Sequence, residues 1–278
     1  MSFAKKKTIR AAFAAVVVAA SLVLSACAPA SETAGLTITE GKLTIGTGQP
    51  AYEPWVVGDN PESGEGFEAA VAYAVAEKLG YKKEDVVWVR TTFDEAIAPG
   101  PKNFDFNLQQ YSITAERAKN VDFSTPYYST SQTVITIEGS KAFSATSIAD
   151  LQGLVIGAAT GTTSYQAITD VIKPTTEAQA FNSNDDAVAA LKSGQIDALV
   201  VDLPTALYEV AADLTGGKII GQLPDTSTGG DQFGLVLDKG SKLTAKVSAA
   251  VDALRADGTL AAIEAKWLAD FAQAPVLK

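Results

Sequence analysis

The sequence predicts an α/β protein built from two lobes. From residue 42 onward, short runs rich in β-branched residues alternate with segments whose apolar residues recur at helical spacing. Such alternation indicates mixed, mainly parallel sheets flanked by helices. It falls into two successive series of about 90 residues each. Two sheets, and therefore two lobes, are the arrangement that follows.

The first series covers residues 42–131. Its clearest helix is expected at 67–79, where Phe67, Val71 and Val75 share one face and Gly80 ends the pattern. Thr114 is the expected cap of a short helix at 115–119. The other expected elements are strands at 43–45, 86–89 and 104–108 and a short helix at 93–98.

The second series begins with a strand at 132–137. Further strands are expected at 154–158, 178–181, 198–201, 218–220 and 233–237. Helices are expected at 148–151, 162–171, 185–192, 203–212, 242–256 and 260–268. In open α/β sheets ligands bind at the carboxyl ends of strands, so residues that follow strands are candidates for a site.

Composition excludes several chemistries. The chain has no His, one Cys, and 22 Lys+Arg against 32 Asp+Glu, which gives a formal charge of −10. Histidine-dependent nucleophiles and metal sites are therefore impossible, and one Cys allows neither an internal disulfide nor a zinc pair. The acidic balance argues against nucleic acid. The glycine clusters at 46–48 and 157–163 lack the fingerprints of nucleotide sites. We expect no metal and no cofactor.

Residues 1–26 are predicted to be an export signal. Basic residues at 5–7 and 10 precede an apolar run at 11–24, which is shorter than the ~20 residues of a membrane-spanning helix. An attached anchor helix is the less favoured alternative. Leu24-Ser25-Ala26-Cys27 resembles the bacterial lipobox, which implies that Cys27 carries a lipid, palmitate included, and becomes the mature N-terminus. Residues 27–41 are expected to form a flexible tether. The protein would then lie outside the cytoplasm, anchored to the membrane.

Arg117 is the strongest candidate for ligand binding. It follows the strand at 104–108 and the turn at Ser112, and it lies in the first turn of a short helix. An arginine beside free backbone N–H groups and a hydroxyl can bind a carboxylate. An ordinary surface arginine is the alternative.

The motifs around Arg117 resemble those of the type 2 periplasmic solute-binding proteins for polar amino acids (family 3), the extracytoplasmic receptors of ABC importers. The resemblance extends over nearly the whole chain after residue 42. It comprises Gly66-Phe67-Glu68, Ser112-Ile113-Thr114 with Arg117, Val121-Asp122-Phe123-Ser124 with Pro126-Tyr127-Tyr128, Asp150-Leu151, Gly161-Thr162-Thr163, Ala190-Leu191-Lys192-Ser193-Gly194 with Ile196-Asp197-Ala198, Asp202, and Asp257-Gly258-Thr259 with Lys266-Trp267.

This resemblance implies a ligand cleft between two closing lobes. Arg117 and Ser112 would hold the α-carboxylate of an amino acid, with Thr162 and Thr163 adding donors from the other lobe. Asp202 would bind the α-ammonium, and helix capping is the alternative for this residue. Since the site has no His, binding would be nearly flat between about pH 6 and 8.

Aromatic walls around the ligand side chain are implied at Tyr52, Trp55 and Phe93, with core packing as the alternative for each. Gln109 and Gln110 stand where the family usually has small residues. An ammonium on the ligand side chain has no evident partner unless Glu53 supplies it. Glutamines both donate and accept, which favours a neutral polar side chain.

The resemblance also implies the layout of the lobes. Residues 42–131 and 231–278 would form lobe 1, and 132–230 would form lobe 2. The expected partners are the permease subunits of an ABC importer with a cytoplasmic ATPase, and the chain is expected to be a monomer. The alternative function is an exported dehydratase-like enzyme on the same fold. Such an enzyme would need an acid–base group, for which Glu53, Asp202 and a lysine are the candidates.

Overall fold

The computed structural model describes residues 33, 35–225, 230–268 and 274–278. The predicted signal at 1–26 and the predicted lipid site Cys27 lie outside these residues. In the described part, no helix is long and apolar enough to cross a membrane.

The first sheet has the strand order β2-β1-β3-β12-β4. Its strands are β1 (Leu43–Gly48), β2 (Val86–Thr91), β3 (Phe106–Asn107), β4 (Val121–Phe123) and β12 (Val236–Asp238). β1 pairs in parallel with β2 and β3, whereas β12 pairs antiparallel with both β3 and β4. Four of the five strands therefore point the same way.

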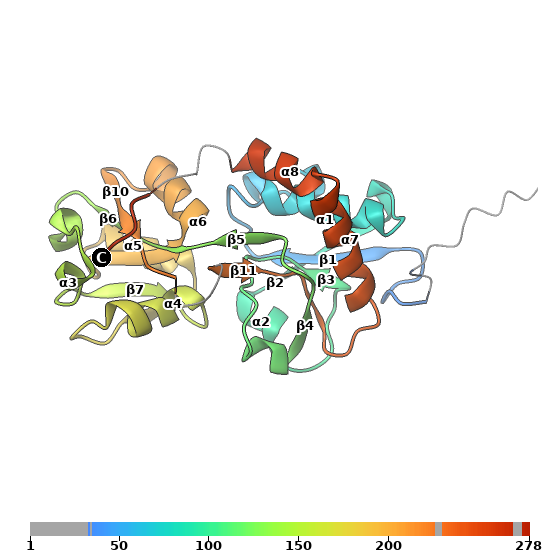
Figure 1. Cartoon of the computed structure of the whole chain (residues 1–278), viewed down its shortest axis with the longest axis horizontal. Coiled ribbons are helices and arrows are strands. Elements are labelled where there is room, and N and C mark those ends of the chain that lie inside the picture. Colours follow the sequence, from blue (N-terminus) through green and yellow to red (C-terminus); the bar gives the residue numbers. More distant parts are fainter. Residues whose placement is uncertain (1–32, 34, 226–229, 269–273) are drawn as a thin grey trace, which may run out of the picture. The chain divides into compact units, whose positions relative to one another are not determined.

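Helices cover both faces of the first sheet (Figure 1). α1 (Phe67–Lys78) packs with α7 (Thr244–Ala256) and α8 (Thr259–Trp267). The apolar side of these three helices and one face of β1 and β3 form the largest hydrophobic core. The short α2 (Phe93–Ile97) begins with a capping box at Thr92 and closes the opposite face.

The second sheet has the strand order β10-β6-β9-β7-β8. Its strands are β6 (Gln132–Ile137), β7 (Ile156–Ala159), β8 (Gln179–Phe181), β9 (Ala198–Asp202) and β10 (Gly217–Gln222). β9, β7 and β8 are parallel, and β6 is antiparallel to its neighbours β9 and β10. This sheet, like the first, has one reversed strand.

Two cores flank the second sheet. One contains α3 (Ile148–Leu151) and α4 (Thr163–Ala167), which a π turn extends over Ile168–Ile172. The other contains α5 (Asn184–Lys192) and α6 (Leu203–Tyr208), which a π turn extends over Glu209–Asp213. Below, the first lobe and the second lobe mean each sheet with its helices.

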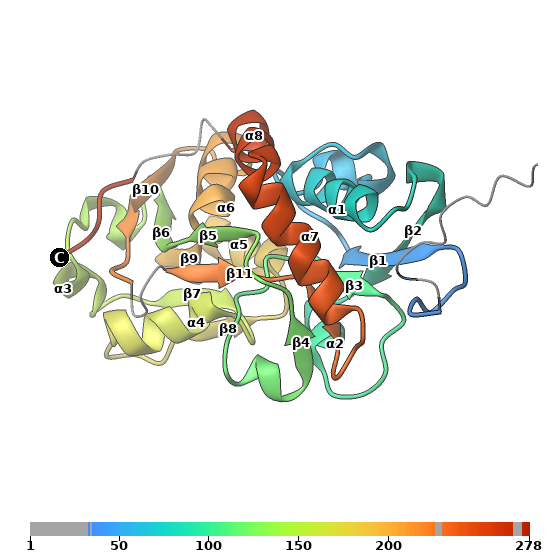
Figure 2. The ribbon, with the colours of Figure 1, turned by 45° about the vertical axis from the view of Figure 1, so that its right-hand side comes forward.

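A two-stranded antiparallel ribbon links the lobes. It pairs β5 (Tyr128–Thr130) with β11 (Asp231–Phe233), which lie side by side in Figures 1 and 2. β5 leads directly into β6, and β11 leads into β12. The reversed strand in each sheet is thus the first strand that the chain forms after it passes along the ribbon.

The predicted α/β architecture with two sheets is confirmed, with local differences. The strand predicted at 233–237 is two strands, because the chain leaves the ribbon at Phe233 and joins the first sheet at Val236. The helix predicted at 115–119 is a 3-10 turn, Arg117–Lys119. β4 and β5 were not predicted, since three residues are too few to display a periodic pattern.

Both ends of the described chain depart from the expected layout. Pro275 O accepts from Gln222 N at 2.8 Å, and Leu277 is buried in the second lobe. The assignment of 231–278 to lobe 1 is therefore wrong for the last residues. At the other end, Leu36 packs on the first core and Ile38 N donates to Asp105 Oδ1 at 2.8 Å. That part of the predicted tether is attached to the domain.

Candidate functional site

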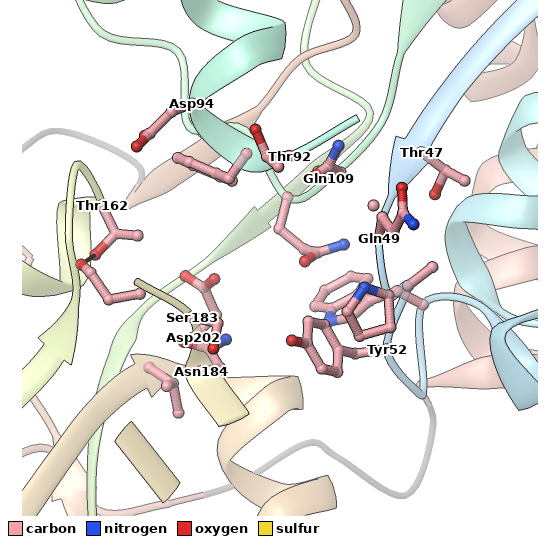
Figure 3. Close-up of a pocket in the computed structure, with 18 of the residues that line it drawn as sticks. Thr47, Gln49, Tyr52, Thr92, Asp94, Gln109, Thr162, Ser183, Asn184 and Asp202 are labelled. Atoms are coloured by element: carbon pink, nitrogen blue, oxygen red, sulfur yellow. Dashed lines mark hydrogen bonds between the residues drawn. The ribbon is translucent and has the colours of Figure 1, made fainter. Parts of the chain in front are cut away.

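A cavity of about 190 Å³ lies between the two lobes at the carboxyl ends of their strands (Figure 3). Eight of the nine residues predicted to bind the ligand line it: Tyr52, Trp55, Phe93, Gln110, Arg117, Thr162, Thr163 and Asp202. Ser112 is not in the lining and lies behind Arg117. Thr47, Gln49, Glu68, Asp94, Gln109, Ser183 and Asn184 also line the cavity.

Arg117 is held in place by hydrogen bonds to the protein backbone. Arg117 begins the 3-10 turn that follows β3 in the chain, and it is 7% exposed. Nη1 donates to Ser112 O at 2.8 Å, and Nη2 donates across the cleft to Gly161 O at 2.9 Å. The guanidinium carbon lies 5.2 Å from the centroid of the Phe93 ring. Burial lowers the pKa of Arg117, yet a guanidinium stays charged at neutral pH.

Thr162 and Thr163 mark the start of α4 in the second lobe. Thr162 is the N-cap residue, and its Oγ1 accepts from Tyr165 N at 3.1 Å and donates to Ala159 O at 2.7 Å. Thr163 Oγ1 lies 3.1 Å from Ser112 Oγ of the first lobe. The Thr162 hydroxyl is thus occupied by capping, and the Thr163 hydroxyl faces the other lobe.

Asp202 ends β9 at the base of the cavity. It occupies the N-cap position of α6 but makes no capping hydrogen bond, which removes the support for capping as its role. Instead, its Oδ1 accepts from Gln132 Nε2 at 2.8 Å, and the same nitrogen donates to Asp231 Oδ2 at 2.6 Å. Burial, reinforced by the nearby Asp231 carboxylate, raises the pKa of Asp202 to about 8. The site therefore favours a proton or a cation at Asp202.

That raised pKa argues against an expectation made from the sequence. Binding was expected to be flat between about pH 6 and 8, because isolated Asp and Arg side chains do not titrate there. Composition alone cannot reveal that Asp202 loses its hydration and shares a nitrogen donor with Asp231. A carboxyl group in such surroundings titrates within that range.

The three predicted aromatic residues differ in their surroundings. Trp55 is fully buried with Phe67, Tyr128 and Phe233 packed edge-on around it, and its Nε1 donates to Thr205 Oγ1 of the second lobe at 3.0 Å. Trp55 is therefore a core residue as well as a lining residue.

Tyr52 and Phe93 are only partly buried. The Tyr52 hydroxyl donates to Asp185 Oδ2 of the second lobe at 3.1 Å. Phe93 stacks on Tyr111 with ring centroids 4.6 Å apart and lies beneath Arg117. These two rings can contact a ligand without leaving the core.

Glu68 is a site residue that the sequence argument missed. It lies on the buried side of α1, is 2% exposed, and accepts from Gln110 N at 2.8 Å, from Gln110 Nε2 and from the Tyr127 hydroxyl. Burial raises its pKa to about 7 against the lowering effect of these hydrogen bonds. A carboxylate on the apolar face of a predicted helix was the available signal. Glu53, the suggested partner for a side-chain ammonium, is not in the lining and accepts from Gly58 N.

The described residues contain no cluster of His, Cys, Asp and Glu side chains that could hold a metal ion. The groups that converge on the cavity are instead one buried cation, Arg117, and carboxyl groups that include Asp202 and Glu68. Contacts from Arg117, Ser112, Tyr52 and Trp55 reach the second lobe, so the lobes are closed on one another.

Comparisons with known proteins agree with this geometry. Residues 43–270 match the family model for bacterial extracellular solute-binding proteins, family 3. The L-arginine-binding protein of Pseudomonas aeruginosa is 30% identical over 225 residues, which cover 79% of this chain and 85% of that protein. The ABC transporter glutamine-binding protein of Bacillus subtilis is 31% identical over 214 residues, or 75% of each chain.

Solved structures point the same way. An ancestral arginine-binding protein is 33% identical to this chain, both in its complex with arginine and in its complex with glutamine, with TM-scores of 0.68 and 0.69. The matches cover 82% and 83% of this chain and 99% of that protein. The family resemblance inferred from the motifs is confirmed, and the relatives named here are binding proteins.

Proposed function

Because the chain belongs to the bacterial extracellular solute-binding proteins of family 3, we propose that it is the amino-acid receptor of an ABC importer. The observation that carries this proposal is the pairing of Arg117 and Asp202 in one cavity. Arg117 comes from the first lobe and Asp202 from the second, and both line the space between the lobes. A free amino acid carries the complementary pair of charges on neighbouring atoms.

The α-carboxylate of the ligand would bind Arg117. Two of the five guanidinium N–H groups are used by Ser112 O and Gly161 O, so others are available for a charge-assisted contact. Thr163 at the start of α4 would add a hydroxyl donor, and Ser112 would support the site from behind Arg117. The α-ammonium would bind Asp202. Because the pKa of this carboxyl group is raised, a positive charge beside it would stabilise its ionised form.

The finer proposal is that the ligand has a neutral polar side chain. Around the end of the cavity formed by the first strand and its neighbours, the lining includes Thr47, Gln49, Gln109 and Gln110, which are uncharged. Glu68 also lies there, but three hydrogen-bond donors already occupy its oxygens. The rings of Tyr52 and Phe93 would flank the aliphatic part of the ligand.

Delivery of the ligand requires partners outside this chain. The proposal includes ABC permease subunits served by a cytoplasmic ATPase, and a monomeric receptor that Cys27 anchors to the membrane through a lipid. A ligand that contacts both lobes stabilises only their closed arrangement, which gives the permease a signal that the receptor is loaded.

Titration calorimetry with the twenty amino acids tests the proposal, with Arg117→Lys as the site variant. Lysine keeps the charge but loses the planar, multiply donating head group. We expect a loss of binding free energy of about 1.5–3 kcal/mol. Arg255→Lys is the matched control, because Arg255 is exposed and pairs with Asp252 outside the cavity. Absence of binding by the wild-type protein to every amino acid would refute the receptor function.

One observation favours a second candidate, a dehydratase-like enzyme. Asp202 and Glu68 both line the cavity with raised pKa values, as general acids and bases often do. Incubation with a prephenate-like substrate, followed by ultraviolet detection of the aromatic product, separates the two functions. Turnover that disappears in Asp202→Asn would establish the enzyme, and absence of product leaves the receptor.

A further inference from the structure

Two adjacent glutamines in the cavity wall are oriented by the protein itself. We propose that Gln109 and Gln110 present only their carbonyl oxygens to the ligand, so that the site takes an amino acid whose side chain ends in a carboxamide NH2 group and rejects the matching carboxylate. This inference rests on the proposed receptor function and specifies its ligand class.

The orientation of Gln109 follows from its neighbours. Its Nε2 lies 2.8 Å from Thr91 Oγ1, 3.3 Å from Thr91 O and 3.4 Å from Asn107 Oδ1. A backbone carbonyl can only accept, so rotating the amide by half a turn would place two oxygens against each other. Gln109 is 8% exposed, and Asn107, which donates to Thr91 Oγ1, is fully buried. Gln109 Oε1 has no intramolecular partner among the described residues, and Gln109 lines the cavity.

Gln110 is oriented by Glu68. Glu68 Oε1 accepts from the backbone N–H of Gln110 at 2.8 Å, and Glu68 Oε2 accepts from Gln110 Nε2. The Tyr127 hydroxyl donates to the same carboxylate, which has no N–H or O–H of its own when ionised. The turned backbone of Gln110, at φ 52°, lets both of its nitrogens face Glu68. The amide oxygen is then the group left for the ligand.

Charges elsewhere in the lining support this choice. Arg117 donates to Ser112 O and Gly161 O and lies over the Phe93 ring, where the proposed function assigns it to the α-carboxylate, and the described lining contains no Lys. A side-chain carboxylate would therefore meet two carbonyl oxygens with Glu68 behind them. Asp94 also lines the cavity, but its Oδ1 lies beside Gly161 and its charge acts on Arg117, at the carboxylate-binding end.

A carboxamide fits the remaining groups. Its NH2 would donate to Gln109 Oε1 and Gln110 Oε1, and its oxygen would accept from Gln49, whose exposed side chain has no partner among the described residues. Figure 3 shows Gln49 beside Thr47 and near Tyr52 on the first-lobe wall. The Tyr52 hydroxyl is already committed to Asp185.

L-Glutamine and L-glutamate are the decisive probes, because they have the same shape and differ in one terminal group. Calorimetry at about pH 8 keeps Glu68, whose pKa is about 7, mostly ionised. We expect glutamine to bind at least about 100-fold more tightly than glutamate. Equal or tighter binding of glutamate overturns the inference, and so does binding of neither while another amino acid binds. Failure of every amino acid overturns the receptor function itself.

Glu68→Gln tests the role of Glu68 as a positioning residue. The variant frees the Gln110 amide to turn its NH2 toward the cavity, so the preference for glutamine should fall to about 10-fold or less. Glu77→Gln, on the exposed side of the same helix, is the matched control and should retain the full preference. If Glu68 were merely structural, affinity for both ligands would fall together and their ratio would be unchanged.

Gln110→Gly keeps the inference falsifiable if Glu68→Gln fails to fold. Glycine accepts a positive φ without strain, so the turn should survive while one carbonyl acceptor is lost. The ratio of glutamine to glutamate affinity should fall about 10-fold. An unchanged ratio in this folded variant would show that Gln110 does not select the ligand.

Discussion

The two walls of the cleft differ in how far the fold itself satisfies their buried polar groups. On the first-lobe wall, Arg117, Gln109 and Glu68 are buried and already hydrogen-bonded to their own lobe or across the cleft. On the second-lobe wall, Asp202 accepts from Gln132 but lies beside the Asp231 carboxylate, and its pKa is raised to about 8, above the value of about 7 for Glu68. On the first wall, Glu68 accepts three hydrogen bonds, which offset part of the cost of its burial. The second wall still lacks a positive charge, which a ligand ammonium can supply.

We therefore expect the first wall to orient the ligand and the second wall to gain most from the ligand on closure. A wall that is organised before binding orients the ligand at little entropic cost. A wall with an unmet charge gains most when a ligand arrives, so the ligand contributes most to holding the second lobe in place. Changes to the two walls should therefore affect stability and affinity differently.

Asp202→Asn should produce the largest contrast. Loss of the countercharge should weaken amino-acid binding by about 2–5 kcal/mol. The ligand-free variant should nevertheless melt at a higher temperature than the wild type at about pH 8. The reason is that a carboxyl group with a raised folded-state pKa loses stability as pH rises above its unfolded value of 3.8.

Thermal melting of both proteins at about pH 4 and pH 8 checks this sign. The advantage of Asp202→Asn should be much smaller at the lower pH, where the folded carboxyl group is protonated and the unfolded one, with a pKa of 3.8, is ionised only in part. A lower melting temperature of the variant at pH 8 would mean that Asp202 is stabilised as a carboxylate without ligand, and the two walls would then be alike.

The pH dependence of affinity is the next largest effect. Below the pKa of about 8, Asp202 must lose its proton before it can pair with an ammonium group. Affinity should therefore rise with pH between about 6 and 8, by at most tenfold per unit, because one proton is released. Calorimetry in buffers of different ionisation enthalpy would detect that proton. In Asp202→Asn the residual affinity should not show this slope.

Trp55→Phe should have the smallest effect on ligand binding. It removes the Nε1–H that bonds to Thr205 across the cleft, at a cost of about 1 kcal/mol. Trp88→Phe is the matched control, since Trp88 Nε1 donates to Tyr73 within the first lobe. Both variants should lower the melting temperature, Trp55→Phe by more because Trp55 is fully buried and Trp88 is only partly buried, and only Trp55→Phe should also weaken ligand binding. If the two variants bind the ligand equally tightly, the hydrogen bond between Trp55 and Thr205 does not contribute to closure of the lobes.

Much of the site could be predicted from the sequence because its residues follow strands or begin helices. Arg117, Thr162 and Asp202 each occupy such positions, and the structure brings all three to one cavity. Glu68 escaped prediction because its role depends on Gln110, which is 42 positions away in the chain. The sequence could not assign Trp55 to the core or to the site, because in the folded chain it belongs to both.

The α/β class, the two series of elements and the family could be inferred from the sequence alone, since periodic patterns and local motifs are properties of neighbouring residues. The reversed strand in each sheet, the position of the last residues and the hydrogen bonding of each polar group in the cleft became clear only in the folded structure. Those features depend on pairs far apart in the chain, such as Gln132 with Asp231 and Glu68 with Gln110. The free energy of a buried charge depends on the partners that the folded chain places around it.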